Sequence, residues 1–182
     1  ATLEAHVDFS EERLVARYNT DLANELGNLL NRTLNMARRY RSGVVVRRPA
    51  HECDLPAVAE TAVAEYRARM EEHQPGLALE AAWKLAVRCN AFVEESAPWK
   101  LAKDPAAAEI LDGVLYALAE SLRILSILID PVLPVAAAAM RAQLNAGSAP
   151  RLADAGWGLL PDAHTLGEPV PVFPRIERGE SD

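Results

Sequence analysis

Residues 10–43 read SEERLVARYNTDLANELGNLLNRTLNMARRYRSG. Ser10 is a preferred helix N-cap, and Glu11 and Glu12 place negative charge in the first turn, where the helix dipole favours it. The residues that follow recur at spacings of three and four, which is typical of an amphipathic α-helix: Tyr18, Leu22, Leu26, Leu29, Thr33, Met36 and Tyr40. The stretch predicts one long helix that ends near Ser42-Gly43.

Prolines mark the boundaries of four further helices. A proline fits the first turn of a helix, whereas it disfavours helical geometry in the residue that precedes it. On this basis we expect helices over about residues 54–73, 104–129 and 130–145, and one more that follows the break at Pro75-Gly76 and ends at Ala97. No strand of convincing length appears, and residues 44–49 are expected to form a loop or a short extended piece.

These elements together predict an all-α fold, an antiparallel helical bundle of about five helices over residues 9–145. Residues 146–182 are rich in Gly and Pro, and we expect an extended C-terminal tail that lies over other surface and forms no core of its own. The 182 residues suffice for one domain, residues 1–182, and leave no room for a separate nucleotide-binding catalytic domain.

Composition excludes several classes of protein. Half of the residues are apolar and 25% are charged, which excludes a disordered chain. Cys53 and Cys89 are too few for a disulfide framework and no signal peptide is seen, so we expect a protein of the reducing cytoplasm. The most apolar stretch, residues 124–140, is interrupted by Asp130 and two prolines, so we expect no membrane span.

The sequence patterns of most catalytic and metal sites are absent. There is no Gly-rich phosphate loop, no G-x-S-x-G elbow and no H-E-x-x-H pair. His51 and Cys53 could supply two ligands where a metal site needs three or four, so surface residues are the favoured interpretation. The carboxylate pairs at residues 71–72 and 94–95 are expected to be solvated helix ends. We therefore expect no catalytic site, no metal and no cofactor in this chain.

One face of the first helix carries polar side chains that stability alone does not explain. At about 100° per residue, the four asparagines 24, 28, 31 and 35 share a side away from the apolar stripe. Asparagine costs up to ~0.7 kcal/mol relative to alanine in a helix, so four exposed ones favour a binding role. Asn28 and Arg32 lie one turn apart, so both could hydrogen-bond one planar ligand such as a base edge. The alternative is bonding to solvent or to neighbouring helices.

Charge is distributed unevenly along the chain. It holds 19 Lys+Arg and 26 Asp+Glu, and the net charge of −7 argues against general binding of DNA or of membranes. Residues 26–50 nevertheless contain six arginines and no carboxylate. A local field of this kind can hold phosphates, which makes Arg39, Arg41, Arg47 and Arg48 candidate contacts. The alternative is a solvated helix end whose arginines complement the helix dipole.

A second candidate element reads APWKLAK at residues 97–103. Trp99 stands at a helix end, and Lys100 and Lys103 follow one and four residues later. Such a tryptophan can stack on an unpaired base while the lysines approach its phosphates. The alternative is that Trp99 fills the junction between two helices, as we expect of Trp83 in the core.

Three segments resemble one family. Residues 17–33, RYNTDLANELGNLLNRT, closely resemble the opening helix of the C-terminal anticodon-binding domain of methionyl-tRNA synthetases, which are class I aminoacyl-tRNA synthetases. Residues 91–103, AFVEESAPWKLAK, are similar to the second signature of that domain, and residues 167–177, GEPVPVFPRIE, to the segment that ends it. The resemblance is collinear over about residues 9–177.

The resemblance implies a helical bundle that recognises the CAU anticodon of methionine tRNA. It implies that Asn28 and Arg32 contact the first anticodon base and that Trp99 stacks on it. The family's catalytic domain, which uses ATP and Mg²⁺, has no counterpart in this chain, so the expected partners are the anticodon stem-loop and that catalytic domain. The alternative is a free-standing, non-catalytic helical bundle that acts as a protein-interaction scaffold.

Overall fold

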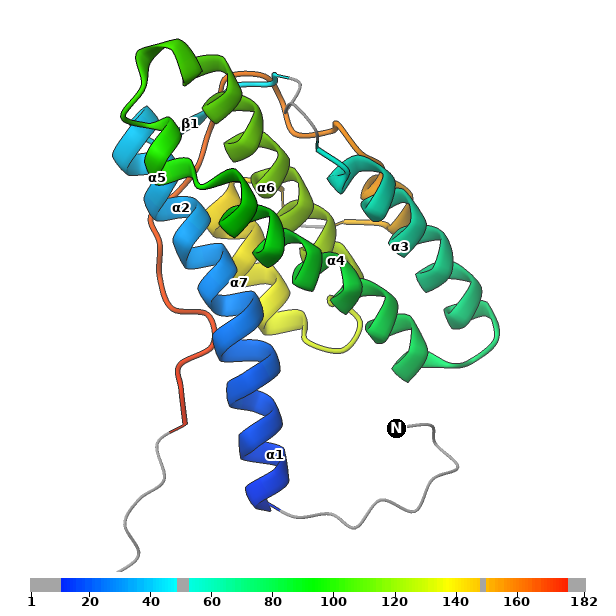
Figure 1. Cartoon of the computed structure of the whole chain (residues 1–182). Coiled ribbons are helices and arrows are strands. Elements are labelled where there is room, and N and C mark those ends of the chain that lie inside the picture. The colour runs from blue at the N-terminus through cyan, green and yellow to red at the C-terminus, as the bar shows by residue number, and fades with distance from the viewer. Residues whose placement is uncertain (1–10, 49–52, 148–149, 177–182) are drawn as a thin grey trace, which may run out of the picture.

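The computed structural model describes residues 11–48, 53–147 and 150–176. Within these ranges five principal helices form a bundle, which confirms the all-α prediction (Figure 1). The first is a continuous helical rod, and four helices follow it along the chain. The rod comprises α1 (Glu11–Arg17), η1 (Tyr18–Gly27) and α2 (Asn28–Arg41), and the others are α3 (Leu55–Glu71), α4 (Pro75–Ser96), α6 (Ala108–Leu128) and α7 (Pro134–Leu144).

Short elements connect the helices. One turn of α-helix, α5 (Pro98–Leu101), follows α4, and two 3-10 turns are η2 (Pro105–Ala107) and η3 (Leu152–Ala155). The short extended piece expected after the first helix is β1 (Val44–Val45), which pairs antiparallel with β2 (His164–Thr165). This pairing, which the sequence does not predict, joins the tail to the end of α2.

The rod ends where the sequence predicts, but its middle third differs. Ser42 adopts the left-handed conformation at φ 53°, and the N–H of Gly43 donates to the carbonyl of Ala37 at 3.1 Å, which closes the helix. The η1 segment is π-helical, and the N–H of Asn28 donates to the carbonyl of Ala23, five residues earlier. The α-helical geometry used to place the asparagines therefore applies only from Asn28 onward.

The proline signals locate most of the remaining boundaries. Ala97 ends α4 in the left-handed conformation, immediately before Pro98, as predicted. The last helix is the exception, because it begins at Pro134 and not at Asp130-Pro131. The carboxylate of Asp130 forms an ion pair with Arg141 at 2.7 Å instead of capping a helix.

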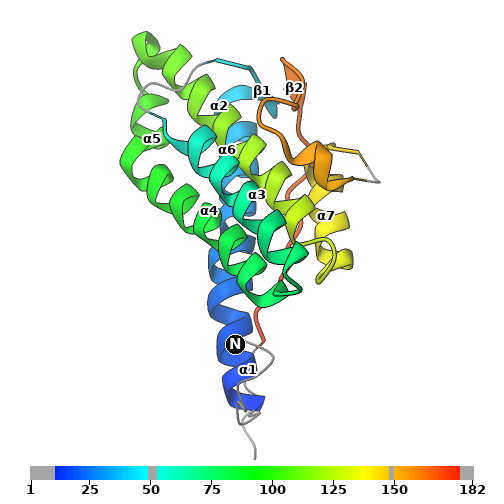
Figure 2. The ribbon, with the colours of Figure 1, turned by 90° about the vertical axis from the view of Figure 1, so that its right-hand side faces the viewer.

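The core is built around α6, which is buried at every position from residue 113 to 128. A helix that is buried all round must have neighbours on each side, and α6 packs against α2, α3, α4 and α7 (Figures 1 and 2). None of the helices in the described ranges is both long and apolar enough to cross a membrane.

The C-terminal tail is extended, as predicted, but it also contributes to the core. Its residues 166–176 run along the first rod (Figure 1). Four tail side chains join the hydrophobic core of the bundle, namely Ala155, Leu160, Leu166 and Phe173. The phenyl ring of Phe173 packs edge-on against Tyr18, with ring centroids 6.4 Å apart. The tail is thus part of the fold, which its Gly and Pro content does not reveal.

Candidate nucleic-acid interface

Asn28 and Arg32 lie in the first turns of α2. The side chain of Asn28 is exposed and forms no side-chain hydrogen bond within the described ranges. The guanidinium of Arg32 is partly exposed, and its Nη2 donates to Oε1 of Glu94 at 2.7 Å. Because Glu94 is in the last turn of α4, this bond holds the start of α2 against the end of α4.

Trp99 lies just beyond that contact. After α4 ends, Ala97 turns the chain with φ 44° and ψ 61°, and α5 begins at Pro98. A left-handed conformation costs a non-glycine residue about 1–2 kcal/mol, so the surrounding packing must maintain this turn. Trp99 packs against the core, as the alternative interpretation of this residue proposed, and the residue as a whole is partly exposed. Its partial exposure is compatible with stacking on a base.

The remaining asparagines of α2 form a polar row. Asn31 and Asn35 are exposed, and the amide of Asn35 donates to both the backbone and the side-chain oxygen of Asn31 at 2.8 Å. These bonds occupy part of the hydrogen-bonding capacity of both residues. The amide of Asn28 therefore keeps more of its capacity for a ligand than either of them.

Two of the candidate phosphate contacts are engaged within the fold. Arg41 pairs with the carboxylate of Asp112 and donates to the carbonyl of Ala108 at 2.9 Å. Arg47 donates to the hydroxyl of Tyr116 at 3.0 Å and to the carbonyl of Leu160 at 2.7 Å. Both arginines join distant segments of the chain, so their guanidinium groups are occupied by contacts within the protein and are poorly placed to bind phosphates.

The other four candidates extend into solvent. Arg39 lies 5.9 Å from the ring centroid of Tyr40, and Arg48 donates to the carbonyl of Arg47 at 3.0 Å. Within the part of the chain that the structure describes, Arg39, Arg48, Lys100 and Lys103 have no carboxylate partner. Arg38, in contrast, pairs with Glu168 of the tail at 2.5 Å. Exposed cations without a carboxylate partner therefore remain near the end of α2, and one and four residues after Trp99.

Two features of the polar network were not predicted. Glu94, expected to be a solvated helix end, is exposed but also binds Arg32. Glu120 and Arg123 form an ion pair in the core, with Nη2 and Oε1 at 2.7 Å. Sequence gives no signal for the first contact, because its partners are 62 positions apart.

The cysteines show the properties of structural thiols. Burial raises the pKa of the Cys53 thiol, and it raises the pKa of the fully buried Cys89 to about 12. A thiol with a raised pKa is a poor nucleophile and a poor metal ligand. Over the described ranges no three His, Cys, Asp or Glu side chains are grouped closely enough to hold a metal. His51 lies outside the described residues.

Comparison with known proteins identifies the family to which the chain belongs. A family model described as the anticodon binding domain of methionyl tRNA ligase matches residues 46–182. The chain belongs to this family. The methionine–tRNA ligases of Deinococcus radiodurans and Bacillus subtilis are 38% and 42% identical to it, over 183 and 180 residues. These alignments cover 97% and 94% of this chain but 26% and 27% of the relatives, so the chain spans about a quarter of their length.

Solved structures of this family share the fold. The apo form of the Mycobacterium tuberculosis methionyl-tRNA synthetase matches with a TM-score of 0.79 and 33% identity, over 94% of this chain and 36% of that one. The same enzyme bound by methionyl-adenylate matches with a TM-score of 0.82 and 35% identity, over 91% of this chain and 34% of that one. The helical bundle is thus the anticodon-binding domain of a methionyl-tRNA synthetase.

Proposed function

We propose that this domain reads the CAU anticodon of methionine tRNA for a synthetase whose chemistry lies outside the chain. The observation that carries the proposal is the hydrogen bond between Arg32 and Glu94. It joins the start of α2, where Asn28 is exposed, to the end of α4, five residues before Trp99. The bond places Arg32 beside the last turn of α4, and Trp99 follows that turn after Ala97 and Pro98, which supports a shared binding surface.

The chemistry of these side chains suits the first anticodon base, a cytosine. The Watson–Crick edge of cytosine presents one amino donor and two acceptors, and single-stranded RNA is read along such edges. Asn28 offers an amide oxygen and an amide N–H, and Arg32 offers several N–H donors in a fixed plane. Trp99 stacks on the face of the same base, which contributes about 1–3 kcal/mol in comparable complexes.

Binding requires Arg32 to exchange Glu94 for the base. The pair is open to solvent, and exposed ion pairs contribute only about 0–1 kcal/mol. Stacking and base-edge hydrogen bonds together exceed that cost, so the contact with Glu94 holds Arg32 in place without preventing RNA binding. The bond orients the guanidinium while the domain is free.

The exposed cations supply the contacts to the RNA backbone. Arg39, Arg48, Lys100 and Lys103 would each neutralise a phosphate, and each such contact adds about 0.7 to the salt dependence of binding to a single strand. The net charge of −7 keeps binding to other nucleic acids weak. Specificity would then come from the base contacts and orientation from the phosphates.

In the whole enzyme, a catalytic domain outside these residues would use ATP and Mg²⁺ to attach methionine to the tRNA. This chain would contribute recognition alone. Its partners are accordingly the anticodon stem-loop and the remainder of the synthetase.

The test is binding of a CAU stem-loop to matched variants of the chain. We expect Asn28→Ala and Arg32→Ala each to lower affinity by about 1–3 kcal/mol, because each removes a base-edge contact. Asn35→Ala and Arg69→Ala are the controls, since both residues are polar, helical and outside the reading pair. Equal affinity of all four variants and the unmodified chain would refute the proposed base contacts.

A further inference from the structure

The tail contacts the first rod on both sides of the proposed reading residues, Asn28 and Arg32 (Figure 1). On their C-terminal side, Glu168 of the tail pairs with Arg38 at 2.5 Å. On their N-terminal side, the buried Phe173 packs against η1. The tail therefore holds the stretch of the rod that carries the reading residues at both of its ends.

Three contacts join the tail to η1. The ring of Phe173 packs edge-on against Tyr18, and it lies so near the backbone of Gly27 that a Cβ there would be 3.4 Å from it. The side-chain amide of Asn19 donates to the carbonyl of Ile176 at 3.0 Å, and its oxygen accepts the N–H of Ile176 at 2.9 Å. Asn19 thus binds both backbone groups of one tail residue, as a paired strand would.

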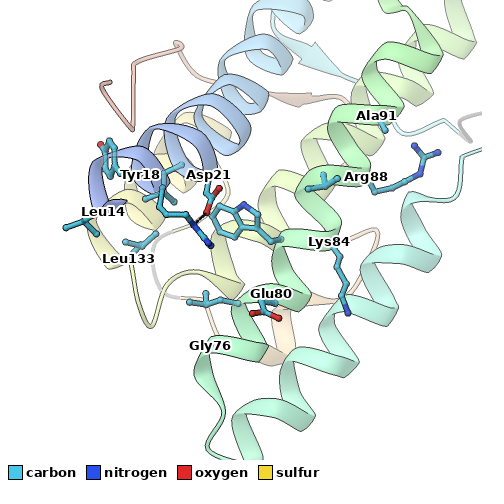
Figure 3. A pocket seen from close by; sticks show the side chains of 14 residues that line it. Leu14, Tyr18, Asp21, Gly76, Glu80, Lys84, Arg88, Ala91 and Leu133 are labelled. Carbon is cyan, nitrogen blue, oxygen red and sulfur yellow. Dashed lines mark hydrogen bonds and ion pairs between the residues drawn. The ribbon is translucent and has the colours of Figure 1, made fainter. Parts of the chain in front are cut away.

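The first half of η1 has little other support within the described residues. A groove of about 940 Å³ separates this part of the rod from α4. Figure 3 shows Tyr18 and Asp21 of the rod on one wall of the groove and Lys84 of α4 on the other. Because α4 does not fill this space, its packing on η1 is incomplete. The tail is therefore a principal packing partner of this half of the segment.

The helical geometry of η1 makes such support important. π-Helices are rare and form mostly single turns, whereas η1 extends over Tyr18–Gly27. The N–H of Asn28 donates to the carbonyl of Ala23, so one reading residue takes part in the π-type hydrogen bonding. A π-type turn closes over one more residue than an α-type turn, and one residue corresponds to about 100° of rotation. Loss of the π geometry would therefore reorient the backbone at Asn28.

We propose that Phe173 and Ile176 are positioning residues for anticodon reading. By packing on η1 they stabilise its π-helical geometry, and through that geometry they fix the orientation in which Asn28 meets the first anticodon base. The inference rests on the proposed function, because the tail has this role only if Asn28 reads that base. The tail then affects recognition through the backbone of the rod, without itself touching the base.

The ratio of affinities for two stem-loops tests this role separately from the stability of the fold. The stem-loops carry CAU or UAU as the anticodon, and we expect the unmodified chain to prefer the first about tenfold. Phe173→Ala should reduce this ratio by about threefold or more, and Phe173→Leu, which keeps an apolar side chain, should give an intermediate ratio. Leu160→Ala is the matched control, since it removes a buried tail side chain that is not in contact with η1. Circular dichroism verifies that each variant is folded at the temperature of the titration.

A second variant tests the same role without removing a core side chain. Asn19 is partly exposed, and Asn19→Ala removes both hydrogen bonds to Ile176. We expect this variant to lower the ratio by about twofold or more. Asn35→Ala is its control, because Asn35 is on the same rod and hydrogen-bonds only to Asn31.

A double-mutant cycle tests whether the tail acts through Asn28. In the Asn28→Ala background, Phe173→Ala should leave the remaining discrimination unchanged, and a further full loss there would overturn the inference. Equal losses for Phe173→Ala and Leu160→Ala would also overturn it, because the tail would then contribute stability alone. So would ratios that stay unchanged in both Phe173→Ala and Asn19→Ala. Absence of discrimination by the unmodified chain would instead refute the proposed function.

Discussion

Two arginine–glutamate pairs in this domain have opposite surroundings. Arg123 and Glu120 are buried on α6 and joined by two hydrogen bonds, of 2.7 and 3.0 Å, and Glu120 also accepts the N–H groups of Leu159 and Leu160. Arg32 and Glu94 come from different helices, share one hydrogen bond and are partly open to solvent. The same pair of residue types therefore anchors the tail in one place and leaves a reading side chain free to exchange partners in the other.

In these two pairs burial, and not residue type, separates a structural arginine from one that can bind a ligand. A buried charge whose partner is removed remains desolvated and unpaired, which costs several kcal/mol. An exposed charge that loses its partner is solvated by water at little cost. Arg41 and Arg47 are less buried than Arg123, but each is held by several hydrogen bonds within the fold, whereas Arg39 and Arg48 are exposed and have no carboxylate partner among the described residues.

The largest effect is expected from Glu120→Ala. The substitution leaves the guanidinium of Arg123 unpaired and removes the acceptor for two N–H groups of the tail, so the free energy of unfolding should fall by about 3–5 kcal/mol. Urea titration measures this loss, with Glu94→Ala as the exposed control. A loss below ~1 kcal/mol would mean that the buried pair does not anchor the tail.

The next effect is expected from Trp99→Ala, which should weaken stem-loop binding by about 1–3 kcal/mol because it removes the stacking surface. Trp99→Phe keeps an aromatic face and should recover most of the affinity. Fluorescence anisotropy with a labelled stem-loop measures both variants. If the phenylalanine variant binds as weakly as the alanine variant, stacking is not the role of this residue.

The exposed and engaged cations should differ in their effect on salt dependence. Arg48→Ala and Lys103→Ala should each reduce the slope of log affinity against log salt by about 0.7, since each removes one phosphate contact. Arg41→Ala should leave the slope unchanged and lower the free energy of unfolding instead, because Arg41 binds Asp112 and Ala108. A reduced slope for Arg41→Ala would contradict this division.

The smallest effect is expected from Glu94→Gln. The pair with Arg32 is solvated, so the free energy of unfolding should change by less than ~1 kcal/mol. Thermal unfolding checks this value, and comparison with Glu120→Gln in the same buffer gives the contrast directly. A loss as large as that of Glu120→Gln would show that the Arg32–Glu94 contact is structural.

Local signals explain why the helices could be predicted from sequence. Each boundary depends on a proline or a cap that acts on its immediate neighbours, as Pro98 does in ending α4 at Ser96. The exposed positions of Asn28 and Arg39 follow from helical periodicity alone. The short β1–β2 pair and the buried side chains of the tail depend on segments about 120 residues apart, so no local pattern reveals them.

The π-helical segment illustrates the same limit. The tail packs on this segment, since a Cβ at Gly27 would lie in ordinary van der Waals contact with the ring of Phe173, at 3.4 Å, and only 3.2 Å from the carbonyl oxygen of Leu22. The tail also binds Asn19, whose amide donates to the carbonyl of Ile176 at 3.0 Å. These contacts join positions about 150 residues apart, and the hydrophobic period of residues 10–43 is compatible with an ordinary α-helix throughout.

Discrimination at the first anticodon base is the sharpest test of anticodon reading by this domain. The chain is titrated, at several salt concentrations, with a CAU stem-loop and with the same stem-loop carrying uracil as its first anticodon base. If Asn28, Arg32 and Trp99 read cytosine, the CAU stem-loop binds at least tenfold more tightly at every salt concentration, and Arg32→Ala removes most of the difference. Equal affinity for the two stem-loops would contradict anticodon reading by these residues.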